Sequence, residues 1–120
     1  MKPEEIVQFA EDTHASRDVE QMMQCFEDDI TATWNGQPIA SNKDELRAWY
    51  KNFFDPLQAF TLKKTLRAAN DNVIAVEWHH QRTDADGNQF EGFAAEIWWM
   101  SENNRLSQWH AHCTEYPLDK

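Results

Sequence analysis

The spacing at which apolar residues recur changes once along this chain, and that change constrains the fold more than any other feature. Up to about residue 56, apolar residues recur at helical spacing. From residue 60 onward they alternate with polar residues, as in strands with one buried face. Helices and strands that are segregated along the chain are typical of the α+β class. A length of 120 residues suits one core, so we expect a single domain over residues 1–120.

Local signals place three helices in the first half. Pro3 suits the first turn of a helix that should fade near residue 15. Asp18 is a typical cap for a second helix, whose apolar stripe extends to Phe26. Asn42 and Glu45 form a capping-box pattern at the start of a third helix, which Pro56 ends.

A short strand over residues 30–34 and the tight-turn pair Asn35-Gly36 lie between the second and third helices. Asp86-Gly87 is a hairpin signal in the second half. The long strands are predicted over residues 60–67, 73–83, 90–100 and 106–116. We expect three N-terminal helices packed on one face of a curved, mainly antiparallel sheet.

The predicted strand over residues 90–100 has no polar face. Ala94, Glu96 and Trp98 lie on one side, and Phe93 and Ile97 lie on the other. An antiparallel sheet with one solvated face would alternate apolar and polar residues, so both faces should be covered. The helices cover one face, and a second subunit is the economical cover for the other.

Charge and composition exclude several classes of function. The formal net charge of -10 is the wrong sign for binding nucleic acid or an anionic membrane. No apolar run is long enough to span a membrane, and residues 1–12 lack an apolar signal core, so we expect a cytoplasmic protein. The two cysteines fit free thiols in a reducing compartment. Six tryptophans must line a core, a pocket or an interface.

Three segments carry a family pattern: DVEQMMQCFEDD at 18–29, GQPIASNKDELRAWY at 36–50 and AEIWWMSENNRLSQW at 95–109. In this order and spacing the chain resembles the nuclear transport factor 2-like superfamily, which includes ketosteroid isomerases and SnoaL-like polyketide cyclases. Asn104 departs from the pattern, since the family's turn usually has glycine there. The resemblance implies a cone-shaped α+β barrel with an apolar pocket between helices and sheet. It also implies a dimer through the outer sheet face, which many members form.

The match to the isomerases fails at the catalytic base. Their helical tyrosine corresponds to Ala10, and their general-base aspartate falls at Thr33 and Trp34. Glu96 matches their second acid, and Tyr50 matches their supporting tyrosine. We therefore do not predict ketosteroid isomerase activity.

The family register implies a pocket with titratable groups. Its candidate catalytic residues are Glu96 and His79. Its candidate substrate-binding residues are Trp34, Tyr50, Glu77, Gln81, Trp98 and Trp109. Carboxylates and an imidazole in an apolar pocket are suited to acid–base catalysis. A neutral Glu96 would donate a hydrogen bond to a carbonyl, whereas an ionised Glu96 paired with His79 would act as a base. Alternatively, these side chains form a network that braces the sheet.

The opposite face of the sheet is the predicted homodimer interface. It comprises Trp78, Phe93, Ile97, Trp99, His110 and His112. The alternative cover is a loop or tail of the same chain. His110 and His112 share a strand face with each other, and His80 is a conceivable third metal ligand, but we expect no metal and no cofactor.

Two functions remain open on these residues. The first is an isomerase, dehydratase or cyclase acting on a small apolar carbonyl compound. The second is a non-catalytic ligand-binding or dimerisation module, in which Trp34, Trp98 and Trp109 fill the cone.

Overall fold

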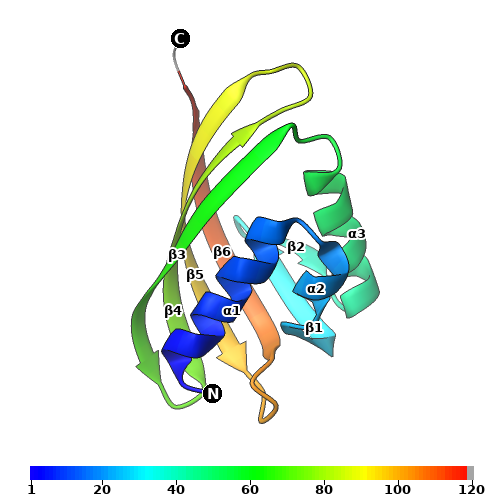
Figure 1. The fold of residues 1–120 in the computed structure, drawn as a ribbon. Helices are drawn as coiled ribbons and strands as arrows, with labels where there is room; N and C mark the ends of the chain where they lie inside the picture. The colour runs from blue at the N-terminus through cyan, green and yellow to red at the C-terminus, as the bar shows by residue number, and fades with distance from the viewer. Residues whose placement is uncertain (119–120) are drawn as a thin grey trace.

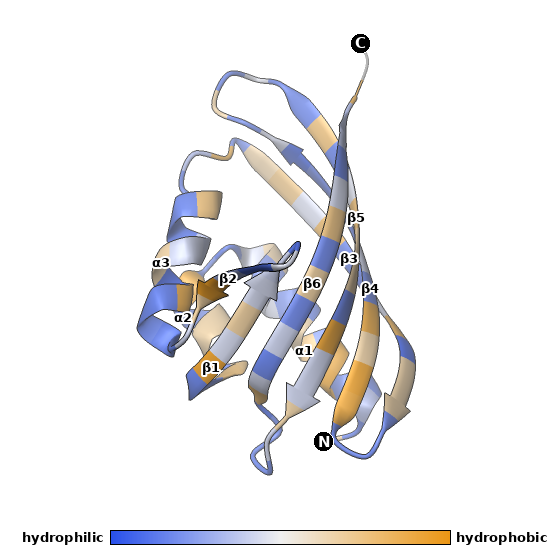
Figure 2. Cartoon of the chain, turned by 180° about the vertical axis from the view of Figure 1, so that it is seen from behind, coloured by the Kyte–Doolittle hydropathy of each residue, from blue (hydrophilic) through white to orange (hydrophobic). Residues whose placement is uncertain are grey.

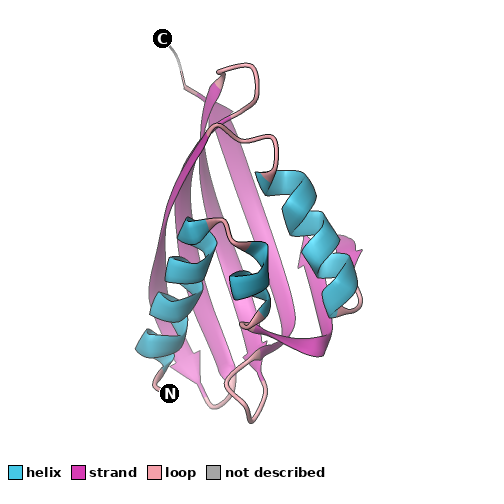
Figure 3. Cartoon of the chain, turned by 45° about the vertical axis from the view of Figure 1, so that its right-hand side comes forward, coloured by secondary structure: helices cyan, strands magenta, loops and turns pink. Residues whose placement is uncertain are grey.

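Helices and strands follow one another as the change of period predicts. The computed structural model describes residues 1–118. Its elements are α1 (Pro3–Ser16), α2 (Val19–Met23), β1 (Phe26–Trp34), β2 (Gln37–Ala40), α3 (Lys43–Phe54), β3 (Ala59–Asn70), β4 (Val73–Thr83), β5 (Gln89–Met100) and β6 (Leu106–Pro117). The helices pack on one face of a single curved sheet, so the predicted α+β cone is confirmed (Figures 1 and 3). No helix in this described part of the chain has both the length and the apolarity needed to cross a membrane.

The predicted caps hold the second and third helices. The Asp18 carboxylate accepts hydrogen bonds from the first backbone N–H groups of α2. Asn42 Oδ1 accepts from the backbone N–H of Glu45 at 2.8 Å, at the start of α3. Helix α2 is shorter than its apolar stripe predicts, because Phe26 is the first residue of β1 and is buried there.

The sheet has six strands in the order β2-β1-β6-β5-β4-β3. Strands β3 to β6 form the predicted antiparallel meander. Strand β1 pairs with β6 in parallel, a contact that the sequence patterns do not indicate. Asn104 has a φ of 60°, so it takes the left-handed turn conformation for which the family uses glycine.

The register of β4 corrects one set of predictions. Val76 pairs with Glu96, so alternate residues of β4 from Ile74 to His80 face the helices together with Glu96. Trp78 is 3% exposed and lies on this inner face, so its predicted place on the outer face is wrong. Glu77, His79 and Gln81 lie on the outer face instead of in the pocket. The apolar residues of β4 can be buried only if these alternate positions face the helices. A register shifted by one residue would move every side chain of the strand to the opposite face of the sheet.

The inner face of the sheet and the helices enclose an aromatic core. Trp98, Trp109, Tyr50 and Phe26 are at most 2% exposed. Trp109 and Tyr50 stack nearly parallel, with ring centroids 6.1 Å apart. Large aromatic side chains from α3, β1 and the long strands therefore form the centre of a core that aliphatic side chains complete.

Candidate functional site: a polar cluster in the aromatic core

A lysine and a glutamate face each other inside this core. Lys64 Nζ lies 3.4 Å from both carboxylate oxygens of Glu96. Their side chains are 2% and 1% exposed. The ammonium also lies over the Trp78 ring, 4.2 Å from its centroid. The pair is thus surrounded by π faces rather than by water.

Two indole groups complete the surroundings of the carboxylate. Trp98 Nε1 donates to Glu96 Oε1 at 2.7 Å, and Trp109 Nε1 donates to the same oxygen at 3.2 Å. With Lys64, three N–H donors converge on Glu96, and an ionised carboxylate can accept from all of them. The arrangement therefore presents Glu96 as a hydrogen-bond acceptor rather than as a donor.

A second polar pair, His14 and Tyr50, adjoins the first. His14 Nδ1 is 2.7 Å from the backbone oxygen of Ala10, and a carbonyl can only accept, so Nδ1 carries the proton. His14 Nε2 is then the acceptor for the Tyr50 hydroxyl, at 3.1 Å. The lone pairs of the Tyr50 oxygen remain available to a further donor.

Burial is the main influence on the titration of these groups. It lowers the pKa of His14 well below its ordinary value, and the Lys64 charge lowers that pKa further. It raises the pKa of Tyr50, and so does the negative charge of Glu96. Burial also lowers the pKa of Lys64, although the Glu96 carboxylate opposes this. At neutral pH, His14 is therefore an uncharged acceptor and Tyr50 an intact phenol.

These four polar side chains border one small cavity. Its volume is about 10 Å³, and its lining is His14, Phe26, Tyr50, Lys64, Glu96, Trp98, Leu106 and Trp109. That is about the space of one water molecule. A ligand pocket usually has on the order of 300–1,000 Å³, so a ligand would have to displace aromatic side chains.

The structure gathers only part of the predicted site. Glu96, Tyr50, Trp98 and Trp109 are buried together, with half-buried Trp34 packing against Trp109. The other predicted residues, His79, Glu77 and Gln81, lie on the opposite, outer face of the sheet. His79 and Glu96 are therefore not neighbours, and the predicted acid–base pair does not form.

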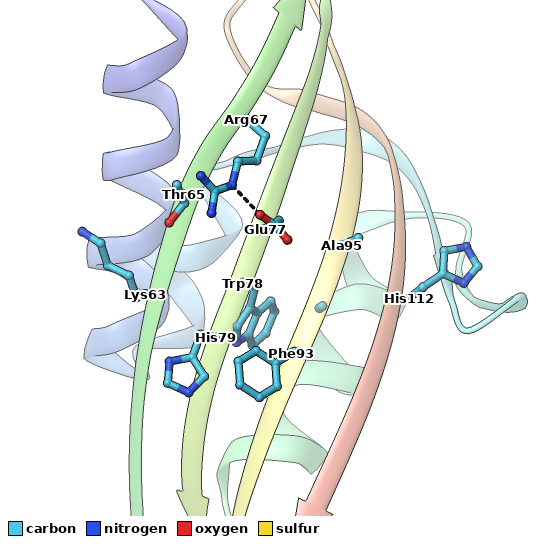
Figure 4. Close-up of a pocket in the computed structure, with 10 residues that line it drawn as sticks. Lys63, Thr65, Arg67, Glu77, Trp78, His79, Phe93, Ala95 and His112 are labelled. Atoms are coloured by element: carbon cyan, nitrogen blue, oxygen red, sulfur yellow. Dashed lines mark hydrogen bonds and ion pairs between the residues drawn. The ribbon is translucent and has the colours of Figure 1, made fainter.

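The outer face instead carries a shallow groove of about 580 Å³ (Figure 4). His79 stacks on Phe93 there, with ring centroids 4.7 Å apart, and hydrogen-bonds Glu91 at 3.0 Å. Arg67 pairs with Glu77 beside them (Figure 4). Polar and apolar residues are mixed across this side of the molecule (Figure 2). Phe93 is 50% exposed and Ile97 37% exposed, so the groove borders an uncovered apolar surface.

Sequence reasoning missed Lys64 and His14, although both carry a signal. Lys64 occupies an apolar position in the alternation Phe60, Leu62, Lys64, Leu66. A lysine in that phase must be buried and therefore needs an acid as partner. His14 follows Val7 and Ala10 at helical spacing, which places it on the buried stripe of α1.

No three His, Cys, Asp or Glu side chains within residues 1–118 are arranged to hold a metal ion. His80, which was considered as a partner for His110 and His112, lies on the inner face instead. Its side chain is 2% exposed and it hydrogen-bonds Glu115 at 2.8 Å.

Comparison with known proteins identifies the family. Residues 6–109 match the model of the SnoaL-like domain family, and the chain belongs to that family. No curated protein matches the sequence.

Solved structures share the fold at low identity. SalBIII, an epoxide hydrolase/cyclase-like enzyme with a role in pyran ring formation in salinomycin, superposes with a TM-score of 0.84 at 14% identity, covering 96% of this chain and 95% of that chain. An NTF2-like protein of unknown function from an Exiguobacterium species superposes with a TM-score of 0.77 at 17% identity, covering 96% of this chain and 99% of that chain. A ketosteroid isomerase-like protein from Erwinia carotovora superposes with a TM-score of 0.72 at 16% identity, covering 98% of this chain and 94% of that chain. These likenesses confirm the nuclear transport factor 2-like fold.

Proposed function

We propose that the protein binds a small, mainly apolar carbonyl compound inside the cone and that Glu96 exchanges a proton with it. The observation that carries the proposal is the convergence of Glu96, Lys64, His14 and Tyr50 on one buried point. A buried ion pair contributes little net stability, because desolvation of both charges offsets their attraction. Perturbed titratable groups in a protein interior are a recognised mark of functional sites.

The geometry suggests a division of roles. Glu96, an acceptor held by three donors, would take a proton from the ligand. The Lys64 ammonium, 3.4 Å away, would stabilise negative charge that develops on a carbonyl oxygen. Tyr50, oriented by His14, would supply a further hydrogen-bonding oxygen. Proton abstraction next to a carbonyl, as in isomerisation, dehydration or cyclisation, fits this set of groups. The family and its likeness to an epoxide hydrolase/cyclase-like enzyme are compatible with it.

A ligand can enter only if the aromatic cover yields. Trp34, Trp49 and Phe53 are half-buried and pack on the outer side of the cluster. Trp49 and Phe53 stack face to face, with an interplanar angle of 3°. These rings are the least enclosed part of the aromatic core, and their displacement would open the interior.

One observation favours a second candidate function. The cavity of about 10 Å³ fits the alternative in which the tryptophans fill the cone and the chain is a non-catalytic module. In that case the Lys64–Glu96 pair only fixes how the core packs.

Ligand-dependent melting separates the two functions. We would screen small apolar carbonyl compounds and acids against the wild type, Glu96→Gln and the control Glu102→Gln, which changes an exposed acid in a turn. A ligand at a hundred times its Kd stabilises the folded state by about 2.7 kcal/mol. The proposal expects a compound that raises the melting temperature of the wild type and of Glu102→Gln, with a much smaller shift in Glu96→Gln. No stabilising compound, or equal shifts in all three proteins, would favour the non-catalytic module.

A further inference from the structure

Two polar atoms elsewhere in the core have no hydrogen-bond partner within residues 1–118. They are Trp78 Nε1 and His80 Nδ1, and both atoms are inaccessible to solvent. The two residues are separated by one position on β4 and therefore face the same side of the sheet. Their ring centroids are 5.5 Å apart. A buried unpaired polar group costs about 1–3 kcal/mol, so two adjacent ones call for an explanation.

The surroundings of His80 fix its orientation. Phe60 stacks against its ring, with centroids 5.8 Å apart. Gly92 lies against the ring as well, since a Cβ added there would be 2.1 Å from His80 Cε1. Nε2 is held by Glu115 at 2.8 Å, and Arg82 in turn holds Glu115 through two hydrogen bonds of 2.7 and 2.8 Å. A carboxylate, a stacked ring and a glycine backbone therefore hold the imidazole in one orientation.

The hydrogen bonds also determine which nitrogen carries the proton. Arg82 is the main cause that keeps the pKa of Glu115 below its ordinary value, so Glu115 is an ionised acceptor. Burial lowers the pKa of His80, which leaves the ring neutral near pH 7. A neutral ring facing a carboxylate carries its proton on Nε2, so Nδ1 presents a bare lone pair.

We infer that Trp78 and His80 form a binding subsite for a ligand hydroxyl group. Trp78 Nε1–H is a donor and His80 Nδ1 an acceptor, and a hydroxyl is both acceptor and donor. One oxygen within about 3 Å of each nitrogen would satisfy both. The inference rests on the proposed function, because the ligand must enter the same core. It adds that this carbonyl compound also carries a neutral alcohol or phenol hydroxyl group.

The subsite is continuous with the Lys64–Glu96 cluster. The Trp78 ring contacts both the Lys64 ammonium, 4.2 Å from its centroid, and the His80 ring. Half-buried Trp34 contacts Trp78, with ring centroids 6.1 Å apart. The aromatic cover proposed to open for the first cluster therefore covers the subsite as well.

Phenol and toluene test the subsite directly, because they have nearly the same shape and differ in the hydroxyl. Each would be titrated into ¹⁵N-labelled protein near pH 7 while the indole N–H resonances are followed. The resonance of Trp78 is assigned by its loss in Trp78→Phe. We expect phenol, and not toluene, to move that resonance markedly. One added hydrogen bond should make phenol bind about fivefold to tenfold more tightly.

Variants separate this inference from the proposed function. Trp78→Phe and His80→Leu should each weaken phenol binding by about fivefold to tenfold and leave toluene binding unchanged. His112→Gln, which changes a histidine on the outer face, should alter neither. If His80→Leu does not fold, the Trp78→Phe variant and the comparison of phenol with toluene on the wild type still test the subsite. Equal affinities for phenol and toluene, with shifts of core indoles, would refute the subsite and leave the interior site standing. No shift of any core indole with either compound would also refute the subsite, whereas the proposed function is decided by the melting screen of carbonyl compounds.

Discussion

Lys64 and Glu96 are both removed from water, and each depends on the other for its charge to be tolerated. The Lys64→Met variant would leave a buried carboxylate without its counter-charge, which typically costs about 3–5 kcal/mol. Adding Glu96→Gln removes that charge and keeps an oxygen to accept from the two indoles. We therefore expect the double variant to recover most of the stability that Lys64→Met loses.

Denaturant unfolding of the two single variants and the double variant measures this coupling. The exposed pair Arg67 and Glu77 is the control, because its side chains are 60% and 57% exposed. Breaking an exposed pair should cost less than about 1 kcal/mol. A double variant whose loss of stability equals the sum of the two single losses would show that Lys64 and Glu96 are not coupled, which would contradict the prediction.

The buried histidines make stability depend on pH. The pKa values of His14 and His80 are lowered in the folded protein from the ordinary value of 6.5, mainly by burial. Below pH 6.5 the histidines of the unfolded chain therefore bind protons that the buried histidines of the folded chain do not bind. The stabilisation is complete above that pH and is lost as the pH falls toward the lowered pKa values.

Between about pH 6 and 5, each histidine should contribute a slope of up to about 1.4 kcal/mol per pH unit. Urea unfolding across this range would measure the slope in the wild type and in His14→Gln. The variant should lose the contribution of one histidine, whatever its overall loss of stability. Identical slopes would show that His14 titrates alike in the folded and unfolded chain.

Among the elements, strands β4 and β5 fit together at Gly92 of β5, which leaves space for the ring of His80 on β4. The row Leu62, His80, Gly92 and Glu115 crosses the inner face of the sheet. The His80 ring occupies the space of a Gly92 side chain, with 2.1 Å between an added Cβ and Cε1. Gly92→Ala should therefore destabilise the fold by roughly 1–3 kcal/mol through overpacking.

The same substitution in a His80→Ala background tests the cause. With the ring removed, Gly92→Ala should be close to neutral, so thermal unfolding of the four proteins gives a large coupling energy. A loss that is the same in both backgrounds would mean that Gly92 is needed for its backbone and not for the space above it.

How far the sequence predicts the fold depends on whether a signal is local. Asp18, Asn42 and the Asn35-Gly36 turn act within a few residues, and these predictions are confirmed. The face of β4 was predicted from family resemblance and is wrong, whereas the alternation of Val76 and Trp78 with polar Glu77 and His79 indicates the right face. Pairing of β1 with β6 joins distant segments that share no pattern, so nothing in either strand predicts it.

The candidate site follows the same logic. Glu96, Trp98 and Trp109 were predicted to face inward from the family register, and they do. The partner of Glu96 was missed because Lys64 comes from an edge strand and reaches across β4. Side chains on non-neighbouring strands meet only through the curvature of the sheet, which no pattern in a single strand encodes.

At the scale of the whole molecule, the outer face of the sheet exposes apolar side chains such as Phe93 and Ile97. We propose that a second copy of the chain covers it. On the outer face of β3 to β5, the charges of Lys63 and Arg67 cancel those of Glu77 and Glu91, whereas the chain as a whole carries -10. Two copies that meet there bring together a neutral surface with exposed Phe93 and avoid the repulsion between their acidic surfaces.

Sedimentation at micromolar concentration tests the dimer. Phe93→Glu would place a charge in the centre of the apolar surface, where an unpaired carboxylate is costly, and should give monomers. Phe9→Glu is the matched control, because Phe9 is 40% exposed on α1, away from this face, and should leave the dimer intact. A monomeric wild type, or a Phe93→Glu dimer, would contradict the proposal.

The parallel pairing of β1 with β6 also sets the order in which the protein can be made. Strand β1 lies between β2 and β6 (Figure 1), and the Asn35 side chain exchanges two hydrogen bonds with the backbone of Cys113, 78 residues away. Of the six strands, β6 leaves the ribosome last. Until then, β1 and β2 have no sheet to join, and α3 lacks Trp109, against which Trp49 and Tyr50 pack. The nascent chain must therefore keep its aromatic helix α3 from aggregating until β6 has been made, and this sheet can be completed only then.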